Sequence, residues 1–261
     1  LVAFQHWGKD IYGLDLSIPA VCDWLGALFR TISNEWGYSF FKVDFLYSAA
    51  LAQGRRQDPH LTRAAAVRKG LEIIREAVGD KFVLGCGAPL GPAVGLVDGM
   101  RIGADVHVEW QPFWPDLSAP SVSNAMLNSV TRSFMHRRLW LNDPDCLLLR
   151  PRGPNANLSP TETRFLATVA SISGSLVIDS DDLAELTPER LDYLRCVLPP
   201  YEKSAVAADL FRNERPRTLV LPIETNWDTW TIVALLNWDN DPRVTELELA
   251  QVRSEERRVG K

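Results

Sequence analysis

Two acidic and two basic residues stand where short apolar runs of the sequence end. Asp44 ends one run with Lys42 two positions before it, and Asp105 ends another with Arg101 four positions before it. Side chains alternate along a strand, so Lys42 points to the same face as Asp44, where its ammonium can keep that carboxylate ionised. Two carboxylates facing each other across a sugar-sized gap can cleave a glycosidic bond, since one attacks or activates while the other protonates the leaving oxygen.

These residues belong to a set of five apolar runs that recur at the spacing of strand–helix units. The runs are Phe40–Phe45, Phe82–Cys86, Met100–Asp105, Leu139–Asp143 and Ser175–Asp179. In parallel α/β barrels the carboxyl ends of the strands form the active face, so polar residues recurring there indicate one site assembled from distant sequence. For any single aspartate the alternative stays open that it only caps the next helix.

Helical periodicity between the runs predicts the connecting helices. They are expected over about 17–37, with Ser17 as N-cap and Pro19 in the first turn, and over about 61–78, 118–136, 159–171 and 187–199. Ser159 and Glu162 have the spacing of a capping box. Residues 87–99 are rich in Gly and Pro, which favours a short, irregular crossover.

From about residue 204 the pattern changes to short alternating runs. Thr218–Pro222, Trp230–Leu236 and Val244–Leu249 predict a small antiparallel β domain. We therefore expect residues 1–203 to be the C-terminal part of a barrel and 204–252 to be an incomplete β domain. Residues 253–261 are uniformly polar and resemble translated adapter sequence, so they are excluded as a non-native tail. The chain opens without methionine, and we expect it to be cut from something longer.

The composition is that of an ordinary globular protein. The 261 residues are 46% hydrophobic and 23% charged, with a formal net charge of −5 and a pI near 5.5. An acidic chain with scattered arginines argues against a nucleic-acid partner, and the sequence has neither a membrane span nor a signal peptide. The four cysteines show no metal-type spacing, which favours reduced thiols and a cytoplasmic location.

Several ordered motifs together resemble the α-galactosidases of glycoside hydrolase family 36, whose clan shares a (β/α)8 catalytic barrel. The motifs are Lys42–Phe45, Leu84–Pro89, Val97–Asp105, Asn142–Asp145 and Ser180–Leu183. The resemblance runs over roughly residues 4–200 without a large gap. It implies a partial (β/α)8 barrel, with strands four to eight and their helices, that leads into the start of a small antiparallel β domain.

The resemblance also implies roles for residues. Asp44 would be the nucleophile and Asp105 the general acid/base. The galactose subsite would be lined by Lys42, Cys86, Gly87, Arg101 and Trp7. For Trp7 a packing role fits equally well. The motif Asn142–Asp145 is interpreted as scaffold rather than as direct substrate contact.

An aromatic loop follows Asp105 and contains Trp110, Phe113 and Trp114. It is interpreted either as a platform for the aglycone or as loop packing. Before the Lys-x-Asp strand, family members carry a large β domain and a paired-aspartate strand that holds O4 and O6 of the sugar. This chain has neither, so its preference for galactose rests on the resemblance alone.

The sequence therefore predicts a fragment of a retaining α-galactosidase that acts on substrates of the melibiose or raffinose type. It would need no metal or organic cofactor, and the full-length enzyme could form a homo-oligomer. We expect five strands to be too few for a barrel that folds and works alone, because such barrels need about 250 residues.

Three alternatives remain at this stage. The same machinery could serve an α-N-acetylgalactosaminidase or a galactosyl transferase of the raffinose-synthase kind. A metal-dependent lyase or isomerase would instead use Asp44, Asp105 and Asp143 as hard oxygen ligands for Mg²⁺. The third alternative is a non-catalytic sugar-binding relic.

Overall fold

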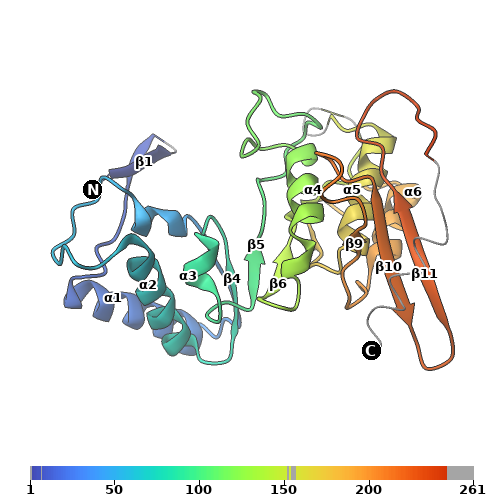
Figure 1. Cartoon of the computed structure of the whole chain (residues 1–261). Coiled ribbons are helices and arrows are strands. Elements are labelled where there is room, and N and C mark those ends of the chain that lie inside the picture. The colour runs from blue at the N-terminus through green and yellow to red at the C-terminus, as the bar shows by residue number, and fades with distance from the viewer. Residues whose placement is uncertain (1, 7, 152, 154–156, 246–261) are drawn as a thin grey trace. The chain divides into compact units, whose positions relative to one another are not determined.

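The chain folds into two compact units, shown in the computed structural model of Figure 1. The structure describes residues 2–6, 8–151, 153 and 157–245. The first unit comprises residues up to 102 together with 137–143, and the second comprises 103–136 and the residues from 144 onward. None of the helices in these described ranges is long and apolar enough to cross a bilayer.

A parallel four-stranded sheet forms the centre of the first unit. Its strands follow the order β3 (Phe40–Val43), β4 (Phe82–Gly85), β5 (Gly99–Arg101) and β6 (Leu141–Asp143). Phe40 pairs with Phe82, Leu84 with Gly99, and Met100 with Asn142. Four of the five predicted strands therefore lie side by side in one parallel sheet, and their carboxyl ends share one edge of it.

Two amphipathic helices lie against each other in this unit, α1 (Pro19–Arg30) and α2 (Arg63–Val78) (Figure 1). Thr62 caps α2 by accepting a hydrogen bond from the backbone N–H of Ala65 at 3.2 Å, and the helix ends at Gly79 in a positive-φ conformation. A π turn, η1 (Thr31–Glu35), extends α1 toward β3.

The predicted cap of α1 is wrong by one residue. Ile18, not Ser17, is the N-cap, and its side chain makes no capping hydrogen bond. Ser17 instead donates its hydroxyl to Asp15 at 2.6 Å and accepts the backbone N–H of Asp58 at 3.0 Å. The Ser17 hydroxyl is therefore bound to the Asp15 carboxylate and does not cap the helix.

Three smaller elements complete the first unit. An antiparallel hairpin that the sequence pattern did not predict joins β1 (Val2–His6) and β2 (Lys9–Tyr12). A 3-10 turn, η2 (Leu46–Ala50), follows β3. The Gly- and Pro-rich crossover contains only α3 (Leu90–Ala93), which confirms its short, irregular form.

The second unit contains helices and a short pair of parallel strands. The helices are α4 (Val122–Thr131), α5 (Pro160–Ile172) and α6 (Pro188–Val197), with a 3-10 turn η3 (Ser133–Met135) after α4. The strands are β7 (Cys146–Leu147) and β8 (Ile178–Asp179). The capping box of Ser159 and Glu162 at the start of α5 is confirmed, and α4 is shorter than predicted because Ser121, after Pro120, is its N-cap.

An antiparallel sheet closes the described chain, in the order β11 (Thr229–Leu235), β10 (Thr218–Glu224) and β9 (Val206–Ala207). It shares one hydrophobic core with α4 and α5, to which Val122, Met126, Leu166, Val169, Leu219 and Leu221 contribute. The third predicted run, Val244–Leu249, is not a strand at Val244 and Thr245, and its other residues lie outside the described ranges, as does the tail 253–261. The fold is thus α/β with a parallel sheet and a small antiparallel sheet, as predicted, while the domain boundary near residue 203 stays a prediction.

Candidate active site

The carboxyl ends of β3 and β4 bring Asp44 and Cys86 level with each other. The backbone N–H of Cys86 donates to the carbonyl of Val43 at 2.8 Å, which continues the parallel ladder by one residue beyond β4. Next along the chain, the N–H of Tyr47 donates to the carbonyl of Gly87 at 2.7 Å. This hydrogen bond joins the loop after β3 to the loop after β4, close to Asp44.

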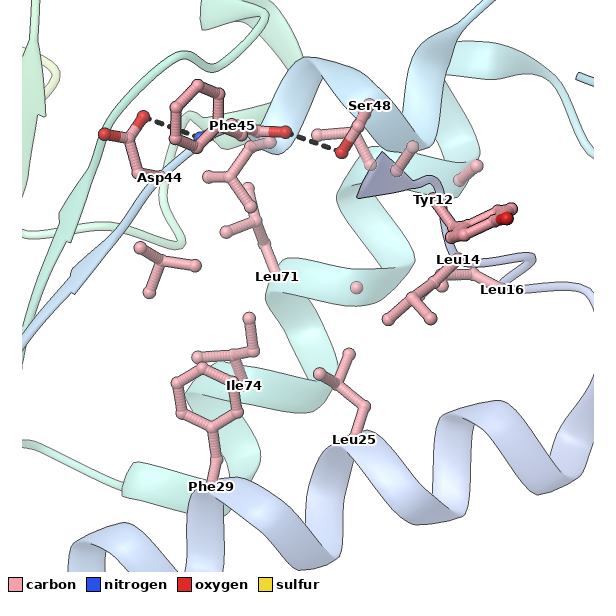
Figure 2. A pocket seen from close by; sticks show the side chains of 16 residues that line it. Tyr12, Leu14, Leu16, Leu25, Phe29, Asp44, Phe45, Ser48, Leu71 and Ile74 are labelled. Carbon is pink, nitrogen blue, oxygen red and sulfur yellow. Dashed lines mark hydrogen bonds between the residues drawn. The ribbon is translucent and has the colours of Figure 1, made fainter. Parts of the chain in front are cut away.

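A tight turn fixes the carboxylate of Asp44. The backbone N–H of Phe45 donates to Oδ1 of Asp44 at 2.6 Å, and the hydroxyl of Ser48 donates to the carbonyl of Phe45 at 2.7 Å (Figure 2). Phe45 has φ of 55°, a left-handed conformation that is strained for a residue with a side chain. Its ring packs against those of Phe4 and Tyr47, with centroids 5.1 and 6.3 Å away. This aromatic packing holds the strained turn that positions Asp44.

Gly87 stands where no side chain fits. Its φ of +52° favours glycine, and a Cβ there would lie 3.0 Å from Oδ1 of Asp44 and 3.1 Å from the backbone nitrogen of Phe45. Glycine at this position therefore lets the β4 loop approach the carboxylate closely.

The thiol of Cys86 is held in its protonated form. Only 4% of the residue is exposed, and this burial, together with a hydrogen bond to Asp44, raises the pKa of Cys86 to about 12, although Arg101 and Lys42 both act to lower it. The same influences show that the two cations lie within electrostatic range of the thiol. The structure thus brings together four of the predicted residues around Cys86.

Arg101 and Asp143 form a buried pair at the ends of β5 and β6. The two residues face each other in the strand register, and Nε of Arg101 lies 3.9 Å from Oδ2 of Asp143. Arg101 is 8% exposed, and Asp143, like its neighbour Asn142, is fully buried. A buried carboxylate beside it orients the guanidinium, which agrees with the interpretation of Asn142 and Asp143 as scaffold.

An apolar hollow of about 220 Å³ lies beneath Asp44 in the same unit. Leu25 and Phe29 of α1 face Leu71 and Ile74 of α2 across it, while the carboxylate of Asp44 lies at its rim and turns away from these side chains (Figure 2). The lining of the hollow is mostly apolar and offers no cluster of polar groups that would bind a sugar.

Asp105 belongs to the second unit, where its backbone is fixed on both sides. Its carbonyl accepts the N–H of Ser121, the N-cap of α4, at 3.0 Å, and the N–H of the next residue, Val106, donates to Oδ2 of Asp145 at 2.8 Å. The predicted strand Met100–Asp105 ends at Arg101 instead, because α4 rather than a neighbouring strand supplies the partner of the Asp105 backbone. The carboxylate of Asp105 is carried on an exposed loop.

The remaining predicted residues divide into two groups. Trp7 lies outside the described residues. Trp110 is 8% exposed and packs in the core, whereas Phe113 and Trp114 are 95% and 53% exposed. Loop packing therefore holds for Trp110, while an aglycone platform at Phe113 and Trp114 stays a prediction. Within the described ranges, no group of three or more His, Cys, Asp or Glu side chains is placed to hold a metal ion.

Sequence reasoning missed a polar cluster beside this loop. The side-chain amide of Asn157 donates to both carboxylate oxygens of Glu109, at 2.9 and 2.7 Å, and its backbone N–H donates to the carbonyl of Val108 at 2.9 Å. The partners are 48 residues apart. No local pattern signals such a contact, and only the position of Glu109 four residues after Asp105 could have drawn attention to it.

Comparison with known proteins gives a consistent result for the fold. No family model matches the chain. Among solved structures, an α-galactosidase from Thermus thermophilus in complex with stachyose has 34% sequence identity over 75% of this chain and 41% of that one, with a TM-score of 0.62. A putative α-galactosidase/melibiase from Bacteroides fragilis is 16% identical, covering 88% of this chain and 49% of that one, with a TM-score of 0.64.

A third structure, α-galactosidase I from Mortierella vinacea, is 18% identical and covers 82% of this chain and 56% of that one, with a TM-score of 0.59. The chain thus spans between 41% and 56% of the length of these three proteins. The likenesses show that the chain has the α/β-barrel type of fold found in α-galactosidases.

Proposed function

We propose that this chain is part of a retaining α-galactosidase of glycoside hydrolase family 36 and carries its two catalytic carboxylates. The observation that carries the proposal is the cluster at the strand ends, where Asp44 lies against Cys86 and Gly87 with Lys42 and Arg101 nearby. The 34% identity to an α-galactosidase supports it. A carboxylate among fixed hydrogen-bond donors and cations can both attack a sugar and hold its hydroxyls.

In the first step, Asp44 attacks the anomeric carbon and the bond from that carbon to the aglycone oxygen breaks. Protonated Asp105 transfers its proton to the leaving oxygen, which gives a β-linked galactosyl ester on Asp44. In the second step, Asp105 removes a proton from water, the water oxygen attacks the anomeric carbon, and Asp44 leaves as a carboxylate. Two inversions give retention of the α configuration.

The neighbours of Asp44 have separate tasks in this mechanism. With a pKa of about 12, Cys86 remains a neutral thiol and acts as a hydrogen-bond donor rather than as a competing nucleophile. Lys42 and Arg101 bind hydroxyls of the sugar. Because Asp143 holds Arg101, the guanidinium keeps one orientation.

Hydrolysis of an aryl α-galactoside tests the proposal. Asp44→Asn is expected to lower turnover by about 10³-fold or more, while galactose binding survives. Asp80→Asn, at an exposed turn before β4, serves as the matched control. Proton NMR of the first-formed sugar should show the α-anomer. Normal turnover in Asp44→Asn, or early appearance of the β-anomer, would contradict the mechanism.

The rival activities are separated by their products and requirements. A raffinose-synthase-like transferase would give a larger sugar when an acceptor is present, and an α-N-acetylgalactosaminidase would prefer the acetamido substrate. Loss of activity in excess chelator would instead favour the Mg²⁺-dependent lyase or isomerase. The cysteine pattern leads us to propose a cytoplasmic enzyme, which cell fractionation can test.

A further inference from the structure

The hairpin of β10 and β11 (Figure 1) carries two tryptophans at its turn, on the surface of the second unit. Trp227 lies in the turn and is 74% exposed, and Trp230, in β11, is 40% exposed. Their ring centroids are 5.5 Å apart and the ring planes are inclined at 34°, so the two rings overlap only in part. Much of both indoles therefore remains open to solvent, and we call these two residues the tryptophan pair.

Hydrogen bonds fix this turn before any ligand arrives. The backbone N–H and the hydroxyl of Thr225 both donate to the carbonyl of Asp228, at 2.9 and 2.8 Å, and the same hydroxyl accepts the N–H of Asp228 at 3.0 Å. The N–H of Thr229 donates to Oδ1 of Asp228 at 2.7 Å. Trp230 pairs across the hairpin with Ile223, which is buried in the core of this unit. A surface that is already ordered reduces the entropy lost when a ligand binds.

The charged groups beside the tryptophan pair largely neutralise one another. Glu224, the last residue of β10, forms an ion pair with Lys203 at 2.7 Å. The hydroxyl of Tyr201 accepts the backbone N–H of Glu224 at 3.3 Å, which holds the segment before β9 against the hairpin. A carboxylate has about four lone-pair sites, and the N–H of Thr229 uses one at Oδ1 of Asp228, so hydroxyl donors can bind the others. These surroundings suit an uncharged ligand with hydroxyl groups better than an anion such as a nucleic acid.

The tryptophan pair is too small for a stable protein interface. A tryptophan side chain buries at most about 250 Å², so the two exposed fractions correspond to roughly 300 Å² of surface. A standard interface covers about 800 Å² on each partner. Ile232, two residues farther along β11, adds only one more exposed apolar side chain. An area of this size matches a few small rings of a ligand rather than the face of a protein.

We propose that the tryptophan pair is a surface binding site for a chain of uncharged sugars. The C–H groups on the flat faces of the sugar rings contact the electron-rich faces of the indoles, and hydroxyls at the ring edges donate to Asp228. The site uses neither Asp44 nor Asp105, and it makes no contact that requires galactose. The inference therefore goes beyond the proposed function and does not depend on it.

Native electrophoresis in gels that contain a polysaccharide tests the inference. The probes are glucomannan and amylopectin, which are uncharged and contain no galactose. We expect at least one of them to retard the wild-type protein and Trp227→Ala to weaken that association about 10-fold. Trp227→Tyr, which keeps an aromatic ring, should retain most of the binding. Phe211→Ala, which removes an almost fully exposed ring near the start of β10, is the matched control and should bind like the wild type.

A measurement on the wild-type protein keeps the test independent of how the variants fold. Mannohexaose and maltohexaose, soluble chains of the same sugar classes, are titrated into ¹⁵N-labelled protein, and the indole N–H signals are followed by NMR. The signals of Trp227 and Trp230 should shift. The signal of Trp238 should not, because its indole N–H is buried and donates to the carbonyl of Pro216 at 2.7 Å.

Unchanged migration with both polysaccharides, or equal retardation of the wild type and Trp227→Ala, would overturn the inference. If Trp227→Ala did not fold, the indole shifts would decide, and shifts confined to other tryptophans would refute the site. Self-association that Trp227→Ala abolishes in gel filtration, without any binding of polysaccharide, would make the tryptophan pair a protein interface instead. If no α-galactoside is hydrolysed but the tryptophan pair binds polysaccharide, the proposed function fails and this inference stands.

Discussion

Replacing Gly87 by alanine should slow catalysis without unfolding the protein. Alanine in the left-handed conformation at φ of +52° costs about 1–2 kcal/mol. The added Cβ would also lie 3.0 Å from Oδ1 of Asp44 and 3.1 and 3.2 Å from the backbone nitrogen and Cα of Phe45. Backbone atoms cannot rotate away, so the turn must shift by a few tenths of an ångström and carry Asp44 with it.

The size of the effect follows from that shift. A misplacement of 1 Å costs about 100-fold in rate, so a shift of a few tenths should lower kcat by about 3- to 10-fold. The backbone cost should lower the melting temperature by about 2–8 °C. Turnover of an aryl α-galactoside and thermal unfolding measure the two effects separately, in this chain or in a longer active protein that contains it.

Gly95→Ala is the matched control for this experiment. Gly95 also has a positive φ, of +80°, but a Cβ there would meet nothing within 4 Å. It should therefore lose a similar amount of stability and keep its kcat. If both variants slowed hydrolysis equally, or if Gly87→Ala turned over as fast as the wild type, the close approach of Gly87 to Asp44 would have no part in catalysis.

Two further predictions concern carboxylates. With azide as an external nucleophile, Asp44→Gly should give β-galactosyl azide and Asp105→Ala should give α-galactosyl azide, and NMR of the products would show a reversal of roles if the two anomers were exchanged. Burial and the charge of Asp181 raise the pKa of Asp179 from 3.8 to about 6, so the folded state holds a proton that the unfolded state has lost and stability falls as pH rises through this window. The full difference corresponds to about 3 kcal/mol, reduced to about 1–2 kcal/mol by solvent at this partly exposed carboxyl. Asp179→Asn should therefore flatten the fall in melting temperature between pH 4 and 7, and an unchanged slope would show that the raised pKa of Asp179 does not affect stability.

The elements that the sequence predicted well are those with local signals. The capping box of Ser159 and Glu162 and the glycine after Val78 mark helix ends through their own side chains and backbone conformations, and the structure confirms them. The parallel strands were recognised from apolar runs at regular spacing. The hairpin at the start of the chain has no comparable alternation, and it was missed.

Errors arose where a distant residue took over a local role. The Ser17 hydroxyl hydrogen-bonds to Asp15, so it does not cap α1 as predicted. The backbone N–H of Ser121 donates to the carbonyl of Asp105, so β5 ends before Asp105. The clustering of Lys42, Asp44 and Arg101 around Cys86 could be predicted because strand ends meet at one edge of a parallel sheet. No rule of that kind connects Glu109 to Asn157.

The protonated thiol of Cys86 also governs how this site tolerates oxidants. With a pKa of about 12, only about one molecule in 10⁵ carries the thiolate at pH 7, and the thiolate is the form that peroxide and alkylating agents attack. Cys196, which is exposed on α6, is open to such reagents. The thiol beside Asp44 thus keeps its hydrogen bond under conditions that would convert an ionised cysteine to a sulfenic acid.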